Sequence, residues 1–157
     1  DHSHGQSLEI APDILLTSFT PTHTSFARIN YYPLCERPQT DNSDGHLGIH
    51  PHTDSGALTV LLQDEVAALQ VLRQGHWHTI EPAADGLIIN IGDMLQEASG
   101  GYFPSTTHRV VNPQGSDLKK ARVSLPLFLH PNPEVVLSER YTAKSYLKER
   151  LEELGVA

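Results

Sequence analysis

The sequence predicts a mainly β domain, a sandwich or jelly roll, that is followed by one C-terminal helix. Short runs of apolar and β-branched residues recur along most of the chain and are separated by turn residues such as Gly, Pro, Asn and Asp. The last segment is different, because its apolar residues Ala143, Tyr146, Leu147, Leu151 and Leu154 recur at helical spacing. Many short strands followed by a single helix are typical of these β architectures.

The strands are expected over residues 25–32, 58–63, 69–73, 76–81, 87–91, 106–111 and 122–129. Pro33 stops the first of them, since proline cannot donate a hydrogen bond to a neighbouring strand. Gln74-Gly75 is a hairpin candidate, and residues 84–86 predict a turn. Residues 37–45 are expected to form a loop because they are rich in Pro, Asn, Asp and Gly. Residues 93–99 predict a single helical turn.

The 157 residues fit one domain with enough length to bury a core. Residues 1–24 are weakly patterned and are expected to be an N-terminal remnant or linker. Residues 25–140 are expected to form the jelly-roll domain. Residues 141–157 are expected to form a helix packed on that domain, with Thr142 as its cap and Gly155 at its end.

The composition narrows the possible partners and compartment. Eleven Lys and Arg against 19 Asp and Glu give a net charge of −8, and no basic run is present, which argues against nucleic acid and anionic membrane as partners. The longest apolar runs, residues 58–62 and 87–91, are too short to span a bilayer. A single cysteine, Cys35, excludes an internal disulfide framework. We therefore expect a cytoplasmic protein that binds a small molecule.

Three residues form a candidate metal site: His52, Asp54 and, far downstream, His108. Residues i and i+2 of an extended strand point to one face, so His52 and Asp54 can present a nitrogen and an oxygen to one cation. His108 can complete the set from another strand. Two imidazoles and one carboxylate that leave other metal positions open are typical of non-haem Fe(II) oxygenases.

His50 offers an alternative, because His50-Pro-His52 is also an i, i+2 pair. A cupin-type site would need a glutamate shortly afterwards, and Glu65 comes too late. We therefore expect His50 at the rim of the site. His76 and His78 flank a tryptophan on a hairpin and are expected to be solvated.

A candidate carboxylate receptor lies fourteen residues beyond His108. Arg122 and Ser124 are another i, i+2 pair, and a guanidinium fork beside a hydroxyl suits a carboxylate. Phe128 lies at an even offset from both, so it is expected to face the same interior and is a candidate substrate contact.

At these residues the chain resembles the catalytic half of the 2-oxoglutarate/Fe(II)-dependent dioxygenases of the isopenicillin N synthase-like group. The matching stretches are residues 28–35, 52–59, 75–82, 90–96, 108–113 and 122–128. They occur in the family order and together cover roughly Phe26 to Pro131. A His-x-Asp alone is a weak match, but six ordered stretches are specific.

The resemblance implies a double-stranded β-helix with iron inside one end of the barrel. It implies Fe(II) ligands at His52, Asp54 and His108, and 2-oxoglutarate contacts at Arg122, Ser124, Asn30 and Tyr32. Asp93 matches an acidic position near the site and is expected to have a supporting role.

The implied activity uses Fe(II), 2-oxoglutarate and O2 to oxidise a C–H bond of a small organic substrate, by hydroxylation or desaturation, with release of succinate and CO2. Two alternatives stay open. One is an Fe(II) oxidase of the same fold that uses no 2-oxoglutarate, and the other is a binding module without turnover.

Two departures from the family pattern add expectations. Only about 25 residues precede the Asn-Tyr-Tyr-Pro stretch, where family members carry a substantial N-terminal region. The chain is therefore expected to be a fragment or a minimal enzyme, with self-association through an uncovered sheet edge and poorly coupled turnover. The Gly100-Gly101 and Phe103-Pro104 pairs lie in a loop near the active-site mouth of the family, so substrate identity does not carry over.

Overall fold

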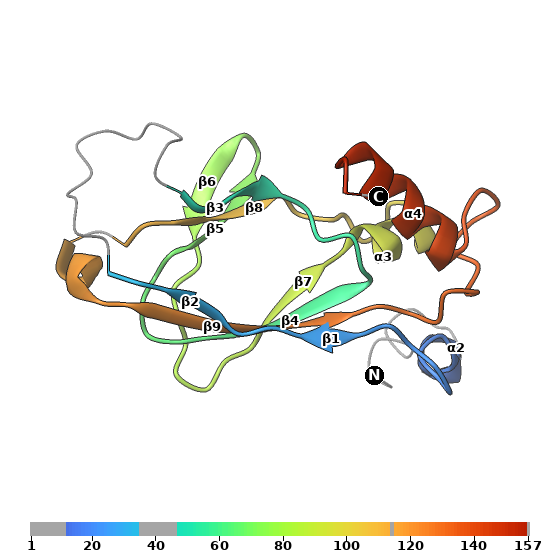
Figure 1. The fold of residues 1–157 in the computed structure, drawn as a ribbon, viewed down its shortest axis with the longest axis horizontal. Helices are drawn as coiled ribbons and strands as arrows, with labels where there is room; N and C mark the ends of the chain where they lie inside the picture. The colour runs from blue at the N-terminus through green and yellow to red at the C-terminus, as the bar shows by residue number, and fades with distance from the viewer. Residues whose placement is uncertain (1–11, 35–46, 114, 157) are drawn as a thin grey trace.

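The computed structural model describes residues 12–34, 47–113 and 115–156. Two antiparallel sheets face each other and enclose the interior of a jelly roll, with the C-terminal helix at one end (Figure 1). The expected mainly β fold with a C-terminal helix is therefore confirmed. The predicted loop over residues 37–45 and the side chain of Cys35 lie outside the described residues. None of the helices in the described ranges has the length and apolarity that a membrane crossing requires.

The larger sheet has five strands built around β9. Its members are β1 (Phe26–Ala27), β2 (Asn30–Tyr32), β9 (Arg122–Leu129), β4 (Leu58–Gln63) and β7 (Ile88–Ile91). Both β1 and β2 pair with β9, which pairs with β4, and β4 pairs with β7. This sheet therefore joins segments from both ends of the chain.

The smaller sheet has four strands. In spatial order they are β3 (Leu47–His52), β8 (His108–Val111), β5 (Leu69–Arg73) and β6 (His76–Thr79). The pairing of β3 with β8 is irregular, with register shifts before and after Ile49. Pro51 lies in this irregular part of an edge strand, where a missing N–H is tolerated.

The helices are α2 (Pro12–Thr17), α3 (Asp93–Ala98), the short 3₁₀ helix η2 (Gly115–Lys119) and α4 (Ala143–Glu153). Thr142 caps α4 as expected, through a reciprocal capping box with Ser145. The helix ends where Gly155 takes a φ of 69°, and the Val156 N–H reaches back to the Leu151 carbonyl.

Most of the predicted strands are confirmed, and β4, β5 and β9 have the expected bounds. Three expectations were wrong in detail. The strand over residues 25–32 is broken between Ala27 and Asn30, and α2 was not predicted. His52 and Asp54 do not share a strand, because β3 ends at His52 and the chain turns immediately afterwards.

Strand β9 carries an inverted burial pattern. Arg122 and Ser124 are 1% and 2% exposed, whereas Leu125 and Leu127 are 41% and 39% exposed. Strand residues alternate between two faces, so the polar side chains point between the sheets and the leucines point outward. Burial of polar groups costs free energy unless they find partners, so this interior is organised for binding as well as for stability.

One apolar cluster packs around the C-terminal helix. Met94 of α3, Leu137 and Ala143 of α4 form a buried cluster, against which Tyr146 and Leu147 pack. Helix α4 therefore lies on α3 (Figure 1).

Gly92 joins β7 to α3 and lies against the loop that follows β3. A Cβ at position 92 would lie 2.1 Å from the carbonyl oxygen of Gly56, so only glycine fits. Around this contact the N–H groups of Gly92, Asp93 and Met94 donate to the carbonyls of residues 57, 54 and 56. The start of α3 thereby fixes the backbone that carries Asp54.

Gly92→Ala should therefore push this loop away from α3. We expect a loss of about 1–3 kcal/mol in the free energy of unfolding, typical of overpacking, together with weaker binding of Co(II) used as a spectroscopic probe of the metal site. The measurements are denaturant unfolding and a Co(II) absorption titration. Gly155→Ala is the control for the Co(II) titration, because its φ of 69° should also cost stability while its Cβ would contact nothing within 4 Å. Equal Co(II) affinity in Gly92→Ala and the parent would contradict the positioning role.

Candidate metal centre and cosubstrate cavity

A cavity lies between the two sheets and is called here the inner cavity. Strand residues at alternate positions line it: Asn30, Tyr32, Thr59, Leu61, Ile88, Asn90, Arg122, Ser124, Pro126 and Phe128 from the larger sheet, and Ile49, His52, Leu69, Val71, His108 and Val110 from the smaller one, together with Asp54. Most of this lining is apolar. The polar residues gather in two groups, one around Asp54 and one around Arg122.

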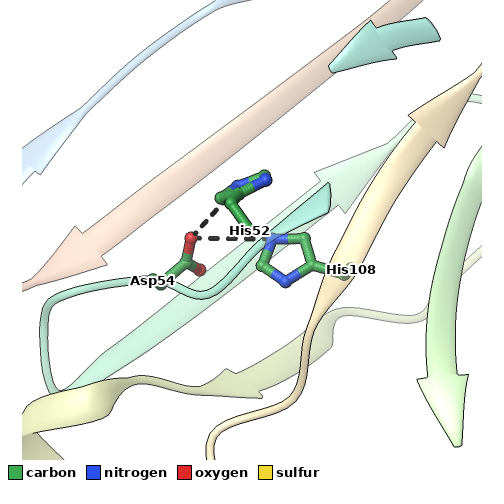
Figure 2. A group of neighbouring side chains, drawn as sticks. All are labelled: His52, Asp54 and His108. Carbon is green, nitrogen blue, oxygen red and sulfur yellow. Dashed lines mark ion pairs between the residues drawn. The ribbon is translucent and has the colours of Figure 1, made fainter. Parts of the chain in front are cut away.

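The candidate metal residues come together at one end of the inner cavity. His52 ends β3 and His108 begins β8, and the two are direct cross-strand partners. Asp54 reaches them from the loop after β3, with Oδ1 at 3.6 Å from Nε2 of His52 and 3.5 Å from Nε2 of His108 (Figure 2). All three ligand atoms lie within 4.8 Å of one another, which is close enough for one ion.

Both imidazoles are oriented by their own strands. Nδ1 of His52 lies 2.8 Å from the carbonyl oxygen of His50, and Nδ1 of His108 lies 3.0 Å from that of Thr106. A carbonyl accepts only, so each Nδ1 carries the proton and each Nε2 keeps a lone pair. Both lone pairs are therefore available on the side of Asp54 Oδ1, which is the arrangement that a divalent metal needs.

The Asp54 carboxylate is held by the opposite sheet. Its Oδ2 accepts hydrogen bonds from the Thr59 hydroxyl at 2.6 Å and from the Asn90 amide at 2.8 Å. Thr59 and Asn90 are cross-strand partners on β4 and β7. Because Oδ2 has two donors, Oδ1 is the oxygen left to bind a metal. The sequence analysis did not assign roles to Thr59 and Asn90, although both lie in the stretches that carried the resemblance.

Asp93 supports the loop rather than the metal position. Its N–H donates to the Asp54 carbonyl at 2.7 Å, and its carboxylate accepts from the Thr53 hydroxyl at 3.1 Å. The guanidinium of Arg150, on α4, lies 3.7 Å from the same carboxylate. Asp93 thus links the C-terminal helix to the loop that carries Asp54.

Arg122 is the buried charge at the other end of the inner cavity. Its Nη2 donates to Gln63 Oε1 at 3.2 Å, and its guanidinium carbon lies 5.1 Å from the centre of the Tyr32 ring. Within the described part of the chain, its Nε and Nη1 have no hydrogen-bond partner. Burial lowers the pKa of the Arg122 guanidinium from its usual value. A buried cation with free donors is a binding site for an anion.

The other three predicted cosubstrate residues surround Arg122. Asn30 is the cross-strand partner of Ser124, and Tyr32 is the partner of Arg122. The Tyr32 ring reaches the smaller sheet, since a Cβ at Gly48 would lie 3.1 Å from it. The structure therefore brings all four residues to one end of the inner cavity. Phe128 also lines this cavity, at the level of the metal residues, as its spacing predicted.

The three remaining histidines that the sequence raised lie outside this cavity. His50, His76 and His78 are all exposed, and only the backbone carbonyl of His50 takes part in the site. A cupin-type pairing of His50 with His52 is therefore not supported.

A jelly roll that holds a His-Asp-His set in its interior has the metal-binding arrangement that is typical of non-haem Fe(II) oxygenases. Residues 23–131 match the model of the 2OG-Fe(II) oxygenase superfamily, and the chain belongs to that superfamily. Among curated relatives, gibberellin 20 oxidase 1-B of Triticum aestivum is 40% identical over 120 residues, which are 76% of this chain and 30% of that protein.

Two solved structures show the same fold. A candidate oxygenase from Shewanella oneidensis is 51% identical, with a TM-score of 0.77 over 91% of this chain and 52% of that one. JOX2, in complex with 2OG, Fe and JA, is 31% identical, with a TM-score of 0.76 over 94% of this chain and 46% of that one. The chain thus spans less than a third of that curated relative and about half of the solved proteins. These findings confirm the expected family and fold.

The hydrogen bonds to Asp54 give a direct test of the candidate metal centre. Thr59→Val removes one donor and keeps the shape of the side chain, and Asn90→Ala removes the other. Each should weaken Co(II) binding roughly 10- to 100-fold, the usual effect of losing a group that holds a metal ligand. Thr79→Val, on an exposed hairpin, is the control. Unchanged affinity in both Thr59→Val and Asn90→Ala would show that Oδ2 does not need these donors.

Proposed function

We propose that this protein is an Fe(II)- and 2-oxoglutarate-dependent oxygenase that oxidises a C–H bond of a small organic molecule. One observation carries the proposal: a His-Asp-His set and a buried arginine with free donors lie at the two ends of one largely apolar cavity. Neither the metal site nor the buried arginine identifies the function by itself. Together they fit a ligand that binds metal at one end and carries a carboxylate at the other.

In this proposal Nε2 of His52, Nε2 of His108 and Oδ1 of Asp54 hold the iron. Three protein ligands of this kind would hold the ion and leave it able to bind small ligands as well. The hydrogen bonds that each Nδ1 donates and those that Asp54 Oδ2 accepts fix the ligands before the metal arrives, so little reorganisation opposes binding. Nitrogen and oxygen ligands of this kind suit Fe(II), and also Co(II), Ni(II) and Zn(II).

Arg122 and Ser124 receive the distal carboxylate of 2-oxoglutarate in this proposal, with Asn30 and Tyr32 beside them. Among the described residues Nε and Nη1 of Arg122 have no partner, so each of the two edges that they form with Nη2 keeps a free donor for a carboxylate. The Tyr32 ring and Gln63 hold the guanidinium in place. JOX2, the relative described above, was solved with both 2OG and Fe.

The iron, with 2-oxoglutarate and O2, supplies the oxidising equivalent for the C–H bond, with succinate and CO2 as products. The protein supplies positions and a dry environment. The apolar side chains of Leu61, Leu69, Val71, Ile88 and Val110 line the cavity between the two polar groups. They exclude water that would otherwise compete for the reactive centre.

The alternative activity is an oxidase of the same fold that uses no 2-oxoglutarate, in which Arg122 and Ser124 would meet the carboxylate of another ligand. The pairing of Asn30 with Ser124 and of Tyr32 with Arg122 favours the cosubstrate user. The two activities differ in whether 2-oxoglutarate is consumed when Fe(II) and O2 are present.

Two metal- and ligand-binding variants test the proposal together. His108→Ala should weaken Fe(II) binding by more than about 100-fold, because it removes a ligand itself. Arg122→Lys should weaken 2-oxoglutarate binding about 10- to 100-fold, or on the order of 1.5–3 kcal/mol, and should leave the metal affinity nearly unchanged. The measurements are calorimetric titrations under anaerobic conditions and the yield of succinate under air.

His76→Ala and Arg73→Lys are the matched controls, since both residues are exposed. Equal Fe(II) affinity in His108→Ala and the parent would refute the metal assignment. Equal 2-oxoglutarate affinity in Arg122→Lys and the parent would favour the oxidase.

A cytoplasmic location and self-association stay predictions. Self-association is expected through an uncovered sheet edge. Beside the edge strand β7, the outer face of the larger sheet also exposes apolar side chains: Leu62, Ile89, Leu125 and Leu127 are each between 39% and 51% exposed. Leu127→Glu should lower the apparent mass in sedimentation velocity if this face associates. If the parent protein is a monodisperse monomer, the prediction of self-association is wrong.

A further inference from the structure

A second hollow lies on the other side of the metal residues and is called here the outer hollow. It is lined by Phe26, Arg28, Phe128 and His130 on the strand side and by Leu147 and Leu151 of α4 on the other. His52, Asp54 and Phe128 line both this hollow and the inner cavity. The outer hollow has a volume of about 430 Å³, which is in the range of small-molecule sites.

Arg28 lies in the outer hollow because alternate residues of this segment point inward. The same alternation brings Asn30 and Tyr32 to the cosubstrate end of the inner cavity. Residues 26, 28, 30 and 32 follow one another along the edge of β9. Asn30 and Tyr32 line the inner cavity, and Phe26 and Arg28 line the outer hollow. The Arg28 N–H donates to the Pro126 carbonyl at 3.0 Å, so the backbone is fixed at this residue although neither β1 nor β2 includes it.

Two aromatic rings hold the Arg28 guanidinium. Its central carbon lies 5.8 Å from the ring centre of Phe26 and 5.6 Å from that of Phe128. The two rings contact each other at a centroid distance of 5.0 Å. Because the two rings contact each other, both lie on the same side of the guanidinium, and cation–π contact from one side leaves N–H groups for a ligand.

The charges around the outer hollow leave Arg28 without a counterion. Apart from the histidines, Arg28 and Asp54 are the charged residues among its described lining. Asp54 is already held by Thr59 and Asn90 and belongs to the metal set. His130 is 7% exposed, and its Nδ1 has no hydrogen-bond partner among the described residues. The guanidinium of Arg28 and the Nδ1 of His130 are therefore both available to a ligand.

We propose that the molecule oxidised by this protein is a carboxylate with an apolar body, and that Arg28 binds its carboxylate in the outer hollow. The inference rests on the proposed function, because it takes the metal residues as the reacting centre. A single guanidinium suits a singly charged carboxylate better than a phosphate dianion, which usually recruits more than one cation. Phe128, Leu147 and Leu151 contact the apolar body and direct it toward the metal end.

Arg28 is thus a specificity-determining residue. Arg122 binds the carboxylate of the cosubstrate on one side of the metal, and Arg28 binds the carboxylate of the substrate on the other. The buried Arg122 makes the reaction dependent on the cosubstrate. The exposed Arg28 selects which molecules reach the centre.

The test compares acids with their own primary amides. The probes are 3-phenylpropanoate, 1-naphthaleneacetate and decanoate, each beside its neutral amide of nearly the same shape. Binding is measured by ligand-observed NMR on the protein loaded with Zn(II) and saturated with 2-oxoglutarate, so that no turnover occurs and Arg122 is occupied. At least one acid should bind about tenfold or more tightly than its amide.

Arg28→Gln should abolish this preference, and Arg73→Gln should retain it. Zn(II) and 2-oxoglutarate affinities, measured in the same samples, should not change in either variant. The inference is overturned if no acid of the panel binds more tightly than its amide, if the preference survives Arg28→Gln, or if the acids displace 2-oxoglutarate. Failure of the parent to bind Zn(II) or 2-oxoglutarate would instead overturn the proposed function.

Discussion

The position of Asp54 is the constraint on which the rest of this structure depends. Asp54 lies on the connection between β3 of the smaller sheet and β4 of the larger one. Its carbonyl accepts from the first turn of α3, and its Oδ2 accepts from Thr59 and Asn90. One residue therefore links both sheets and a helix, and its remaining oxygen faces His52 and His108. If this residue moved, the metal centre and the packing of α3 would change together.

The interior between the sheets carries polar side chains as well as apolar ones. A small jelly roll could fill the space between its sheets with apolar side chains, but here Arg122 and Ser124 point inward while leucines of the same strand point outward. Nε and Nη1 of Arg122 have no partner among the described residues, and a buried polar group that stays unpaired costs free energy. A ligand that supplies the partner recovers this free energy as binding. Stability and affinity are therefore coupled at this position.

The metal residues lie between two spaces with different tasks. The inner cavity is enclosed by the two sheets, so its shape is fixed by backbone pairing. The outer hollow is bounded on one side by α4 and on the other by residues 26–28, where the edge strand is interrupted. Such an arrangement lets the chemistry stay constant while the substrate side changes, because Arg28, Leu147 and Leu151 lie outside the strands and can be replaced without changing a strand pairing.

The sequence by itself determined the strand pattern and the helix with its cap and end. It also singled out the candidate site residues His52, Asp54, His108, Arg122 and Ser124. These features are local, since alternation, capping and ordered motifs can be recognised in short stretches. Only the tertiary structure decided that Asp54 approaches from a turn, that Thr59 and Asn90 hold it, and that Arg28 faces the metal end. Those contacts depend on the register between strands that lie far apart in the sequence, and residue spacing along one strand does not encode that register.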